Sequence, residues 1–482
     1  MRRLASDSVI YGLGSVANQA LAVLLLPLYT RFLSPDEYGS YALINAAGTV
    51  VALAAALGIH SGLTRIFFVY ETAEERGRVV FSALAFALVS TLSVGGALLF
   101  AAPALERLLF GDAGGQLAWV RYAVAIFCLG ALNSVALSNL QIHQRPRSYV
   151  ACSALGLLTS CSVSIWLVAG LGRGVTGVFE GQLAGIAVQL VLALALGVVS
   201  LRPRLHRAAL RDMLTFAIPL LPTNLAAWGL GLADRWFLKQ YASFTDVGLY
   251  ALGYRFGGAL DTLFVAPFTL AWFPYLYSIA HQPDHRAIVA RVLEYFAFAA
   301  GAVVLVLSLF GGDVIRLIAD PAYRDAERVI FWIALGVLFR GMTFITMSGM
   351  NLARRNPLSA VIYGLGVAFN VAMLALLVPR WGMMGAAAAT VLTYLGINLG
   401  FWRVSERHHP IPFRPGKIAW LVCVLIAIHA AARLVPPAPL PAALALKALL
   451  LAAFPAILVA SRFFEAGELG RARQLVRRLR PT

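Results

Sequence analysis

The sequence predicts an all-α polytopic membrane protein with about 14 transmembrane helices. Three observations carry this prediction. Of the 482 residues, 60% are hydrophobic and only 13% are charged, which is too little charge to cover a water-facing surface of this size. Apolar stretches of about 20 residues, the length that crosses a bilayer as a helix, recur along the chain. Short motifs also recur at one spacing, which predicts two six-helix lobes related by a parallel pseudo-two-fold repeat, plus two extra C-terminal helices.

The apolar stretches give the helices in order, and the links between them leave no room for a sizeable extramembrane domain. The first stretch follows a basic start, MRR, and is too long for the core of a signal peptide, so we interpret it as a retained helix. The predicted spans are residues 8–32, 38–64, 79–103, 119–142, 148–170, 175–200, 214–239, 246–276, 292–312, 329–352, 358–378, 385–402, 418–435 and 441–463.

These spans divide the chain into four predicted parts. Residues 1–205 form an N-terminal lobe of helices 1–6, and residues 206–405 form a C-terminal lobe of helices 7–12. Helices 13 and 14 lie within 406–463. Residues 464–482 are a basic cytoplasmic tail, for which two interpretations stay open: an amphipathic segment on the anionic inner leaflet, or a solvated segment that only enforces topology.

The distribution of basic residues predicts the orientation. Of the 39 Lys and Arg residues, 25 fall on the side that carries both termini, 11 on the opposite side and three inside predicted spans. Cytoplasmic loops are the ones enriched in Lys and Arg, so both termini are predicted to be cytoplasmic. The net charge of +17 is explained by this anchoring. No nucleic-acid partner is expected, since basic aromatic platforms and nucleic-acid-binding motifs are absent from the sequence.

The repeat rests on short matches at a nearly constant offset. The pattern acid-x-Gly-x-Tyr-Ala-Leu occurs at 37–43 and again 209 residues later at 246–252. A Gly-x-x-Gly pattern at 174–177 returns 208 residues later at 382–385. We expect the first glycines to permit backbone angles closed to other residues at a tight corner, and the second to permit close helix packing. The acid near each following helix start is stabilised by the helix dipole.

These residues carry a resemblance to a known family. The segments are PLYTRFLSPDEYGSYAL (27–43), PLLPTNLAAWGLGLADRWFL (219–238), GLYALGYR (248–255) and GMMGAAAAT (382–390). With them, the chain resembles the polysaccharide transporter family of the multidrug/oligosaccharidyl-lipid/polysaccharide flippase superfamily. The resemblance implies a flippase that moves undecaprenyl-diphosphate-linked oligosaccharide repeat units across the bacterial cytoplasmic (inner) membrane, for assembly of O-antigen or another exopolysaccharide.

The resemblance also implies partners and a mechanism. The partners are the lipid-linked oligosaccharide, membrane lipids, and the polysaccharide polymerase and chain-length machinery. Two lobes that enclose one cavity would work by alternating access, with the cavity open to one side and then to the other. Since both lobes are present in one chain, we expect a functional monomer.

A diphosphate cargo needs cationic partners, and arginine suits it because its planar donors match phosphate oxygens and its charge persists. Arg255 and Arg340 are predicted to lie about 14 and 16 Å along their helices, well inside the hydrocarbon, where charges usually face a cavity or a partner. Arg31 and Arg235 end helices 1 and 7 in corresponding places. They would line the cavity or snorkel to the interface.

Uncharged polar residues at mid-depth could bind sugar hydroxyls, although hydrogen bonds between helices explain such residues equally well. These candidates are Asn18, Gln19, Asn45, Asn224 and Asn370. Asp234 and Asp261 would either serve a coupling ion or neutralise the arginines, and either could be an ion-pair partner of Arg255.

No catalytic residue, metal site or cofactor is predicted. The four cysteines lie in apolar segments without a paired spacing, so no disulfide is expected. His281 and His285 have i, i+4 spacing but no further metal ligands accompany them. The sequence has no Walker A motif.

Two other functions compete with flipping. A drug or cation antiporter of the same superfamily would need buried acids in the N-terminal lobe, where Glu180 is the nearest acid and lies near a helix start. A membrane polysaccharide polymerase or glycosyltransferase would need a large external loop or an acidic catalytic pair. The predicted external link between helices 3 and 4, about 16 residues, carries only Glu106 and Asp112 as acids.

Overall fold

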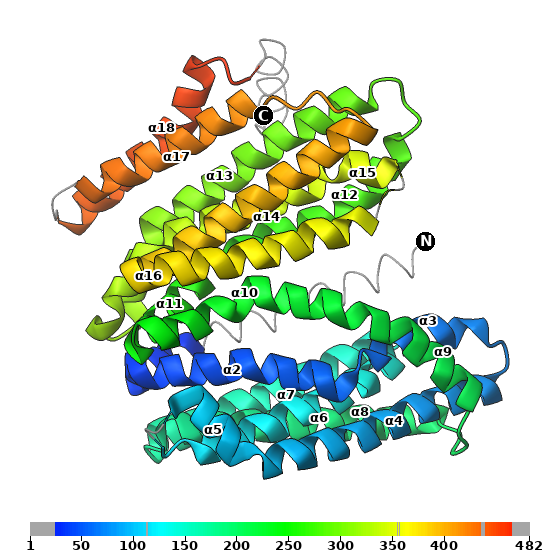
Figure 1. Cartoon of the computed structure of the whole chain (residues 1–482). Coiled ribbons are helices and arrows are strands. Elements are labelled where there is room, and N and C mark those ends of the chain that lie inside the picture. Colours follow the sequence, from blue (N-terminus) through cyan, green and yellow to red (C-terminus); the bar gives the residue numbers. More distant parts are fainter. Residues whose placement is uncertain (1–24, 112–113, 354, 356, 435–438, 465–482) are drawn as a thin grey trace, which may run out of the picture. The chain divides into compact units, whose positions relative to one another are not determined.

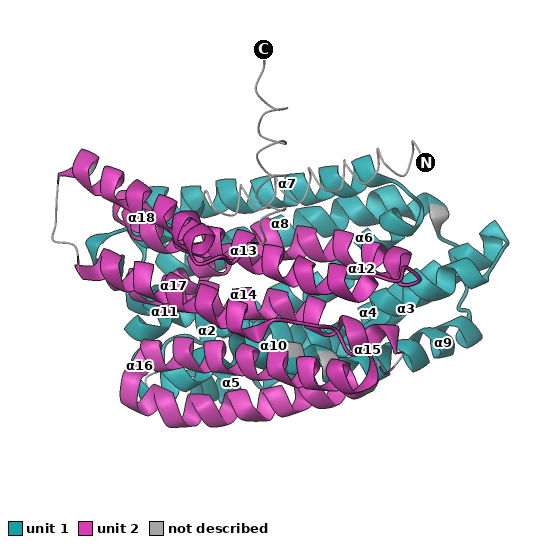
Figure 2. Cartoon of the chain, turned by 90° about the horizontal axis from the view of Figure 1, so that it is seen from above, with its two compact units in different colours: residues 1–249, 318–323 teal, residues 250–317, 324–482 magenta. Residues whose placement is uncertain are grey.

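The computed structural model describes residues 25–111, 114–353, 355, 357–434 and 439–464. All regular secondary structure in these ranges is helical (Figure 1). The chain divides into two compact units, coloured separately in Figure 2. Unit 1 comprises residues 1–249 and 318–323, and unit 2 comprises residues 250–317 and 324–482. The four sequence-based parts, with their boundary at 205, stay predictions beside this division.

Unit 1 contains nine of the described α-helices. They are α2 (Pro35–Ala56), α3 (Ile59–Ile66), α4 (Ala73–Phe100), α5 (Ala102–Phe110), α6 (Leu117–Ile142), α7 (Pro146–Ile165), α8 (Gly174–Gly197), α9 (Arg207–Ala217) and α10 (Leu221–Tyr241). Helices α2 and α7 begin at Pro35 and Pro146, whose fixed φ and missing N–H suit the first helical turn.

Helix α11 (Phe244–Gly257) runs from unit 1 into unit 2. The remaining described α-helices of unit 2 are α12 (Ala266–Ile279), α13 (His285–Ile318), α14 (Glu327–Thr346), α15 (Ser348–Leu352), α16 (Pro357–His408), α17 (Pro415–Leu434) and α18 (Leu440–Ala460). Two short π-helical segments occur in these spans: Trp166–Gly170 ends the span that begins at α7, and Asp261–Val265 interrupts the span that begins at α11.

Within the described residues, 11 helices are long and apolar enough to cross a membrane. The number is 12 if the bent pair Arg207–Ala226 and Trp228–Tyr241 is one span. The first predicted span, 8–32, is described only from residue 25, and residues 25–32 are helical. The predicted spans 358–378 and 385–402 are merged in α16 across a break at Gly382. The polytopic helical fold is therefore confirmed, and the count of 14 stays a prediction.

Small residues let the helices of unit 1 approach closely. Helices α7 and α8 meet at Gly156 and Gly185, where a Cβ on Gly156 would lie 3.0 Å from the Gly185 carbonyl oxygen. A Cβ on Gly181 would lie 2.1 Å from Ser164 Oγ. Packing of small residues is the usual way in which membrane helices associate, because lipid offers no hydrophobic driving force between them.

The exposed and buried faces fit a protein surrounded by lipid. Helix α14 belongs to the candidate span Pro321–Leu352, and 83% of the most apolar stretch of that span is buried inside the protein. Large apolar side chains stand on the surface, including Phe100 at 92% exposure and Leu434 at 85%. Many such residues on one surface would be unfavourable in water, so this surface suits hydrocarbon.

The two copies of the acid-x-Gly-x-Tyr-Ala-Leu motif begin α2 and α11 in the same way. In the first copy the Glu37 amide donates to Ser34 Oγ at 3.2 Å, and the Ser34 amide donates to the Glu37 carboxylate at 2.8 Å. In the second copy the Asp246 amide donates to Ser243 Oγ at 3.0 Å, and the Ser243 amide donates to the Asp246 carboxylate at 3.2 Å. Each acid is thus half of a reciprocal helix cap.

The glycines of this motif bring the two copies together. A Cβ on Gly39 would lie 2.0 Å from the Phe244 carbonyl oxygen, and a Cβ on Gly248 would lie 2.0 Å from the Pro35 carbonyl oxygen. Neither glycine is among those with positive φ. The prediction that these glycines supply unusual backbone angles was therefore wrong. Their lack of a side chain instead allows the starts of α2 and α11 to contact each other.

The other glycine pair does supply such angles. Gly174 and Gly382 have φ values of +54° and +52°, a region that other residues rarely occupy. Gly174 begins α8, and Gly382 marks the break inside α16. Gly177 and Gly385, three residues on, face close neighbours as the sequence predicts: a Cβ on Gly385 would lie 2.3 Å from the Leu377 carbonyl oxygen.

Candidate functional site

An arginine–aspartate pair lies inside the membrane-spanning part of unit 2. Arg340 of α14 contacts Asp261, with Nη2 2.7 Å from Oδ1. Their side chains are 37% and 29% exposed, so the pair is accessible from outside the protein core. A charge pair at this depth is costly and is a functional-site candidate by its chemistry.

The position of Asp261 is set by a local break in its helix. Asp261 begins the π-helical segment Asp261–Val265, whose Ala266 amide donates to the Asp261 carbonyl. Pro267 follows and has no N–H, so the Leu263 carbonyl cannot receive the normal helical hydrogen bond. The wider turn accommodates this loss, and such π-turns occur often at functional sites.

Three tyrosines accompany the pair, and sequence reasoning missed all of them. Tyr394 makes a side-chain hydrogen bond with Arg340, and Tyr254 is close enough to interact with it electrostatically. Tyr363 interacts in the same way with Tyr394 and Arg340. Tyrosine hydroxyls both donate and accept hydrogen bonds, as ligand hydroxyls require. Their signal in the sequence was weak, because a tyrosine within an apolar run is indistinguishable there from a packing residue.

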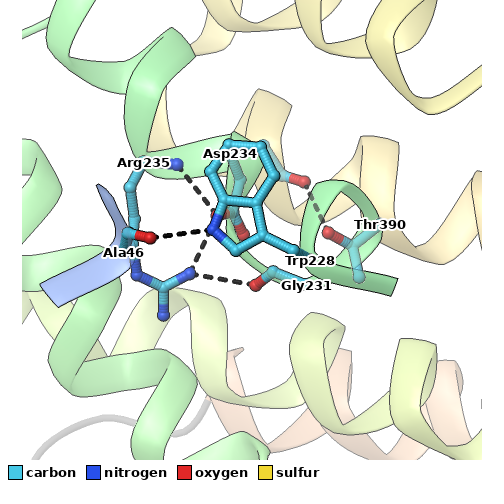
Figure 3. A network of polar contacts seen from close by, with 7 residues as sticks. Ala46, Trp228, Gly231, Asp234, Arg235 and Thr390 are labelled. Atoms are coloured by element: carbon cyan, nitrogen blue, oxygen red, sulfur yellow. Dashed lines mark hydrogen bonds and ion pairs between the residues drawn. The ribbon is translucent and has the colours of Figure 1, made fainter. Parts of the chain in front are cut away.

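Unit 1 holds a second pair, on α10 (Figure 3). Arg235 Nη1 lies 2.9 Å from Asp234 Oδ1 and also donates to the Gly231 carbonyl at 3.1 Å. Trp228, about two helical turns before Arg235, donates from its indole nitrogen to the Ala46 carbonyl of α2 at 2.8 Å. The side chains of Arg235 and Asp234 are only 9% and 5% exposed, so this pair is closed to a ligand in this conformation.

The other predicted site residues fall into different surroundings. Arg31 is exposed on the helical segment 25–32, and Arg255 is half-buried on α11. Asp261, one suggested partner of Arg255, pairs with Arg340. Asp234, the other suggested partner, pairs with Arg235.

The polar uncharged candidates are partly accounted for by packing. Asn45 donates to the Tyr41 carbonyl one turn back in α2, at 2.8 Å. Asn370 is buried and donates to Thr393 Oγ1 at 3.0 Å within α16. Asn224 is exposed on α10. Asn18 and Gln19 lie outside the described residues.

Other chemistry has little support among the described side chains. They hold no cluster of three or more His, Cys, Asp or Glu residues fit for a metal ion. His285 contacts His409, with 2.8 Å between their Nε2 atoms. Glu180, the N-terminal acid of interest for an antiporter, is 3.0 Å from Arg173 and accepts from the Tyr122 hydroxyl. This acid is therefore already neutralised by an arginine.

A family model described as "polysaccharide biosynthesis protein" matches residues 28–327, more than half of the chain. Among curated proteins, protein 1 of the Lsg locus of Haemophilus influenzae is 23% identical over 71% of this chain and 79% of its own length. An uncharacterized membrane protein of Methanocaldococcus jannaschii, MJ1068, is 23% identical over 32% of this chain, a match that spans only 38% of that relative.

Solved structures share the fold at low sequence identity. The lipid II flippase MurJ, in an inward closed conformation, superposes with a TM-score of 0.74 at 11% identity, over 95% of this chain and 100% of that one. An inward-facing multidrug resistance transporter of the MATE family superposes with a TM-score of 0.63 at 16% identity, over 81% of this chain and 94% of that one. At these identities the likeness establishes the fold alone.

Proposed function

Because the chain belongs to the polysaccharide biosynthesis protein family and has the fold of membrane flippases and transporters, not of enzymes, we propose that it flips lipid-linked oligosaccharides. The cargo is an undecaprenyl-diphosphate-linked repeat unit, moved from the inner to the outer leaflet of the bacterial inner membrane. The product feeds a surface polysaccharide, which a polymerase and its chain-length machinery then extend. The protein breaks no covalent bond. Its work is to offer a charged, hydrated headgroup a polar path through hydrocarbon.

The observation that carries this proposal is the accessible Arg340–Asp261 pair. A diphosphate oxygen can replace the Asp261 carboxylate on the Arg340 guanidinium, since both are anionic acceptors for the same planar donors. Such an exchange leaves Arg340 paired both with and without cargo, so the arginine charge is never unpaired in the membrane. The tyrosine hydroxyls beside it suit the sugar hydroxyls that follow the diphosphate.

The closed Arg235–Asp234 pair has a different role in this proposal. Because both side chains are nearly buried, the pair stabilises α10 in this state and would contact cargo only after a conformational change. Alternating access requires such changes, and each state need expose only part of the binding surface. Arg31 and Arg255 remain cargo-contacting candidates, and Asp234 and Asp261 serve to balance charge.

An antiporter for drugs or cations is the second candidate, favoured by the fold shared with a multidrug resistance transporter. Against it stand the contacts of the acids. Asp234, Asp261 and Glu180 each lie within 3.0 Å of an arginine nitrogen. A cation would have to displace that arginine and then share a site with its charge, which is unfavourable.

The deciding experiment removes the gene from the source bacterium and restores it on a plasmid. Surface polysaccharide and the pool of lipid-linked oligosaccharide are measured together. We expect the surface polymer to disappear while complete repeat units accumulate on the lipid carrier, and the wild-type gene to reverse both. Accumulation of incomplete units would assign the protein to sugar assembly. Unchanged polysaccharide with raised drug sensitivity would favour the antiporter.

A further inference from the structure

A polar pocket of about 290 Å³ lies in unit 2, away from the Arg340 site. It is formed where α13 ends, α14 begins, α17 ends and α18 begins. Helices α17 and α18 lie side by side (Figure 1). The charged or titratable side chains that line it are Asp313, Arg316, Glu327, His429, Arg433 and Lys447.

The pocket contains more positive than negative charge. Lys447 Nζ lies 2.5 Å from Asp313 Oδ2, and Arg316 Nη2 lies 3.1 Å from Glu327 Oε2. Arg433 is the third cation, and it reaches a backbone carbonyl, that of Glu327, at 3.4 Å. With three cations and two carboxylates, the charged groups leave one positive charge at the pocket, matched to one monovalent anion.

Uncharged hydrogen-bonding side chains and a closely packed glycine complete the lining of the pocket. Ser308 Oγ and His429 Nδ1 are 2.7 Å apart, and the His429 ring stacks on Phe331 with centroids 4.1 Å apart. Gly312 forms part of the wall, where a Cβ would lie 2.4 Å from Glu327 Oε2. A larger residue at this position would therefore displace the Glu327 carboxylate that holds Arg316.

The pocket lies toward one end of its helices, where a lipid headgroup can be reached. Arg433 is in the last turn of α17, and Lys447 lies seven residues into α18, about 10 Å from the start of that helix, with a long side chain that can extend toward the headgroups. Leu309, Leu446 and Leu450 add an apolar wall on the same side. Among the candidate spans of the described residues, α18 is the least buried, with 11% of its most apolar stretch inside the protein. Lipid can therefore approach the pocket along α18.

From this combination we propose that the pocket binds the phosphate of an anionic membrane phospholipid, with its acyl chains along α17 and α18. Arg433 and Lys447 contact the phosphodiester oxygens, Arg316 flanks them, and Ser308 or His429 donates a hydrogen bond. A phosphodiester carries one negative charge and so neutralises the pocket. Under the predicted topology the lipid belongs to the outer leaflet. The proposal does not depend on which cargo the protein carries.

The test uses the purified full chain in a neutral detergent, with binding followed by native mass spectrometry. Phosphatidylglycerol is titrated against phosphatidylcholine, and glycerol phosphate serves as the free anion. We expect the wild type to retain phosphatidylglycerol selectively and to bind glycerol phosphate weakly. Equal retention of the two lipids, or equally tight binding of glycerol phosphate, would overturn the lipid assignment.

Two variants locate the site. Arg433→Gln removes the cation that is bonded to a carbonyl, and it should weaken phosphatidylglycerol binding about tenfold, as for loss of one charge-assisted hydrogen bond. Arg328→Gln is the matched control, because Arg328 is exposed at the same end of α14 and lies outside the pocket. The double variant Asp313→Asn/Lys447→Gln removes both members of one ion pair and leaves the net charge of the pocket unchanged. It should also weaken binding, because Lys447 no longer contacts the phosphate. Equal loss in the control, or none in either pocket variant, would refute the site.

Discussion

The arginines within the predicted membrane spans have three different surroundings in this chain, and each implies a different role. Arg235 is buried and paired with Asp234, its neighbour in sequence. Arg340 is partly exposed and lies beside tyrosines, and Arg31 is exposed. The sequence predicted the depth of these residues, because depth follows from position along an apolar run. It could not predict the Arg340–Asp261 pair, since that contact joins residues 79 apart through the packing of two helices.

Arg340 should be required for transport. Arg340→Gln is expected to lower flipping about 10- to 100-fold, through loss of charge-assisted hydrogen bonds to the diphosphate. The flipping activity of Arg340→Lys should lie between those of the wild type and Arg340→Gln, since lysine keeps the charge but loses the planar donors. Complementation of the deletion strain, scored by surface polysaccharide at equal protein level, measures this. Arg107→Gln on α5 is the matched exposed control, and an Arg340→Gln protein with full activity would remove the residue from the site.

The His285–His409 contact predicts a dependence of stability on pH. Burial, and next the charge of Arg286, lower the pKa of His409 below its ordinary value of 6.5. A lowered pKa in the folded state means that stability is present above about pH 6.5 and is lost as pH falls through the folded-state pKa. The melting temperature of the purified protein should therefore fall between pH 7.5 and 5.5. His409→Gln should flatten that slope, and an unchanged slope would contradict this origin.

At the scale of helices, the sequence located the spans well and missed their interruptions. Long apolar runs fix where a helix crosses a membrane, so the predicted segments 79–103, 119–142 and 148–170 agree closely with the observed helices. The break between α2 and α3 was not predicted, because the sequence over 38–64 is continuously apolar and favours one helix. In the structure Leu57 ends α2 with a φ of +45°. The reciprocal caps had a readable signal: Ser34 and Ser243 each precede the motif acid by three residues.

The motif glycines should be intolerant of any side chain. Gly39→Ala places a Cβ against the Phe244 carbonyl oxygen, so the helices must separate, at a cost of about 1–3 kcal/mol. Gly96→Ala is the matched control, because nothing lies within 4 Å of its Cβ position in α4. Thermal unfolding in detergent should show a lower melting temperature for Gly39→Ala alone. Equal melting temperatures for the two variants would mean that this contact is not maintained.

At the scale of the whole molecule, composition predicted a polytopic membrane protein, and the distribution of charge predicted its orientation. The polytopic helical fold is confirmed. Eleven spans in the described part agree with the apolar pattern. The orientation stays a prediction, as it rests on the excess of Lys and Arg on one side and no membrane is present in the structure. The motif spacing predicts a repeat of two lobes, and this repeat stays a prediction. The structure shows that the two copies of one motif contact each other through their glycines.

The orientation can be measured with single cysteines in a chain whose own four cysteines are replaced. Arg324→Cys, in the link before α14, should react with a membrane-impermeant maleimide in intact cells. Arg204→Cys, in the link before α9, should react only after the cells are permeabilised. Both positions are exposed, so accessibility within the protein does not separate them. The reverse pattern would place both termini outside.

The contact between the two motif copies has the form of an isologous interface, in which one surface patch meets its own copy. Gly39 faces the Phe244 carbonyl and Gly248 faces the Pro35 carbonyl, and residues 35 and 244 are themselves 209 apart. Such reciprocity is what a gene duplication would leave if the ancestor were a homodimer of six-helix subunits. In that ancestor every charge would have occurred twice. A fused chain would be free of this constraint, and 209 residues before Asp261 and Arg340 stand Ala52 and Ala131. One half could thus acquire a costly intramembrane ion pair while the other remained apolar.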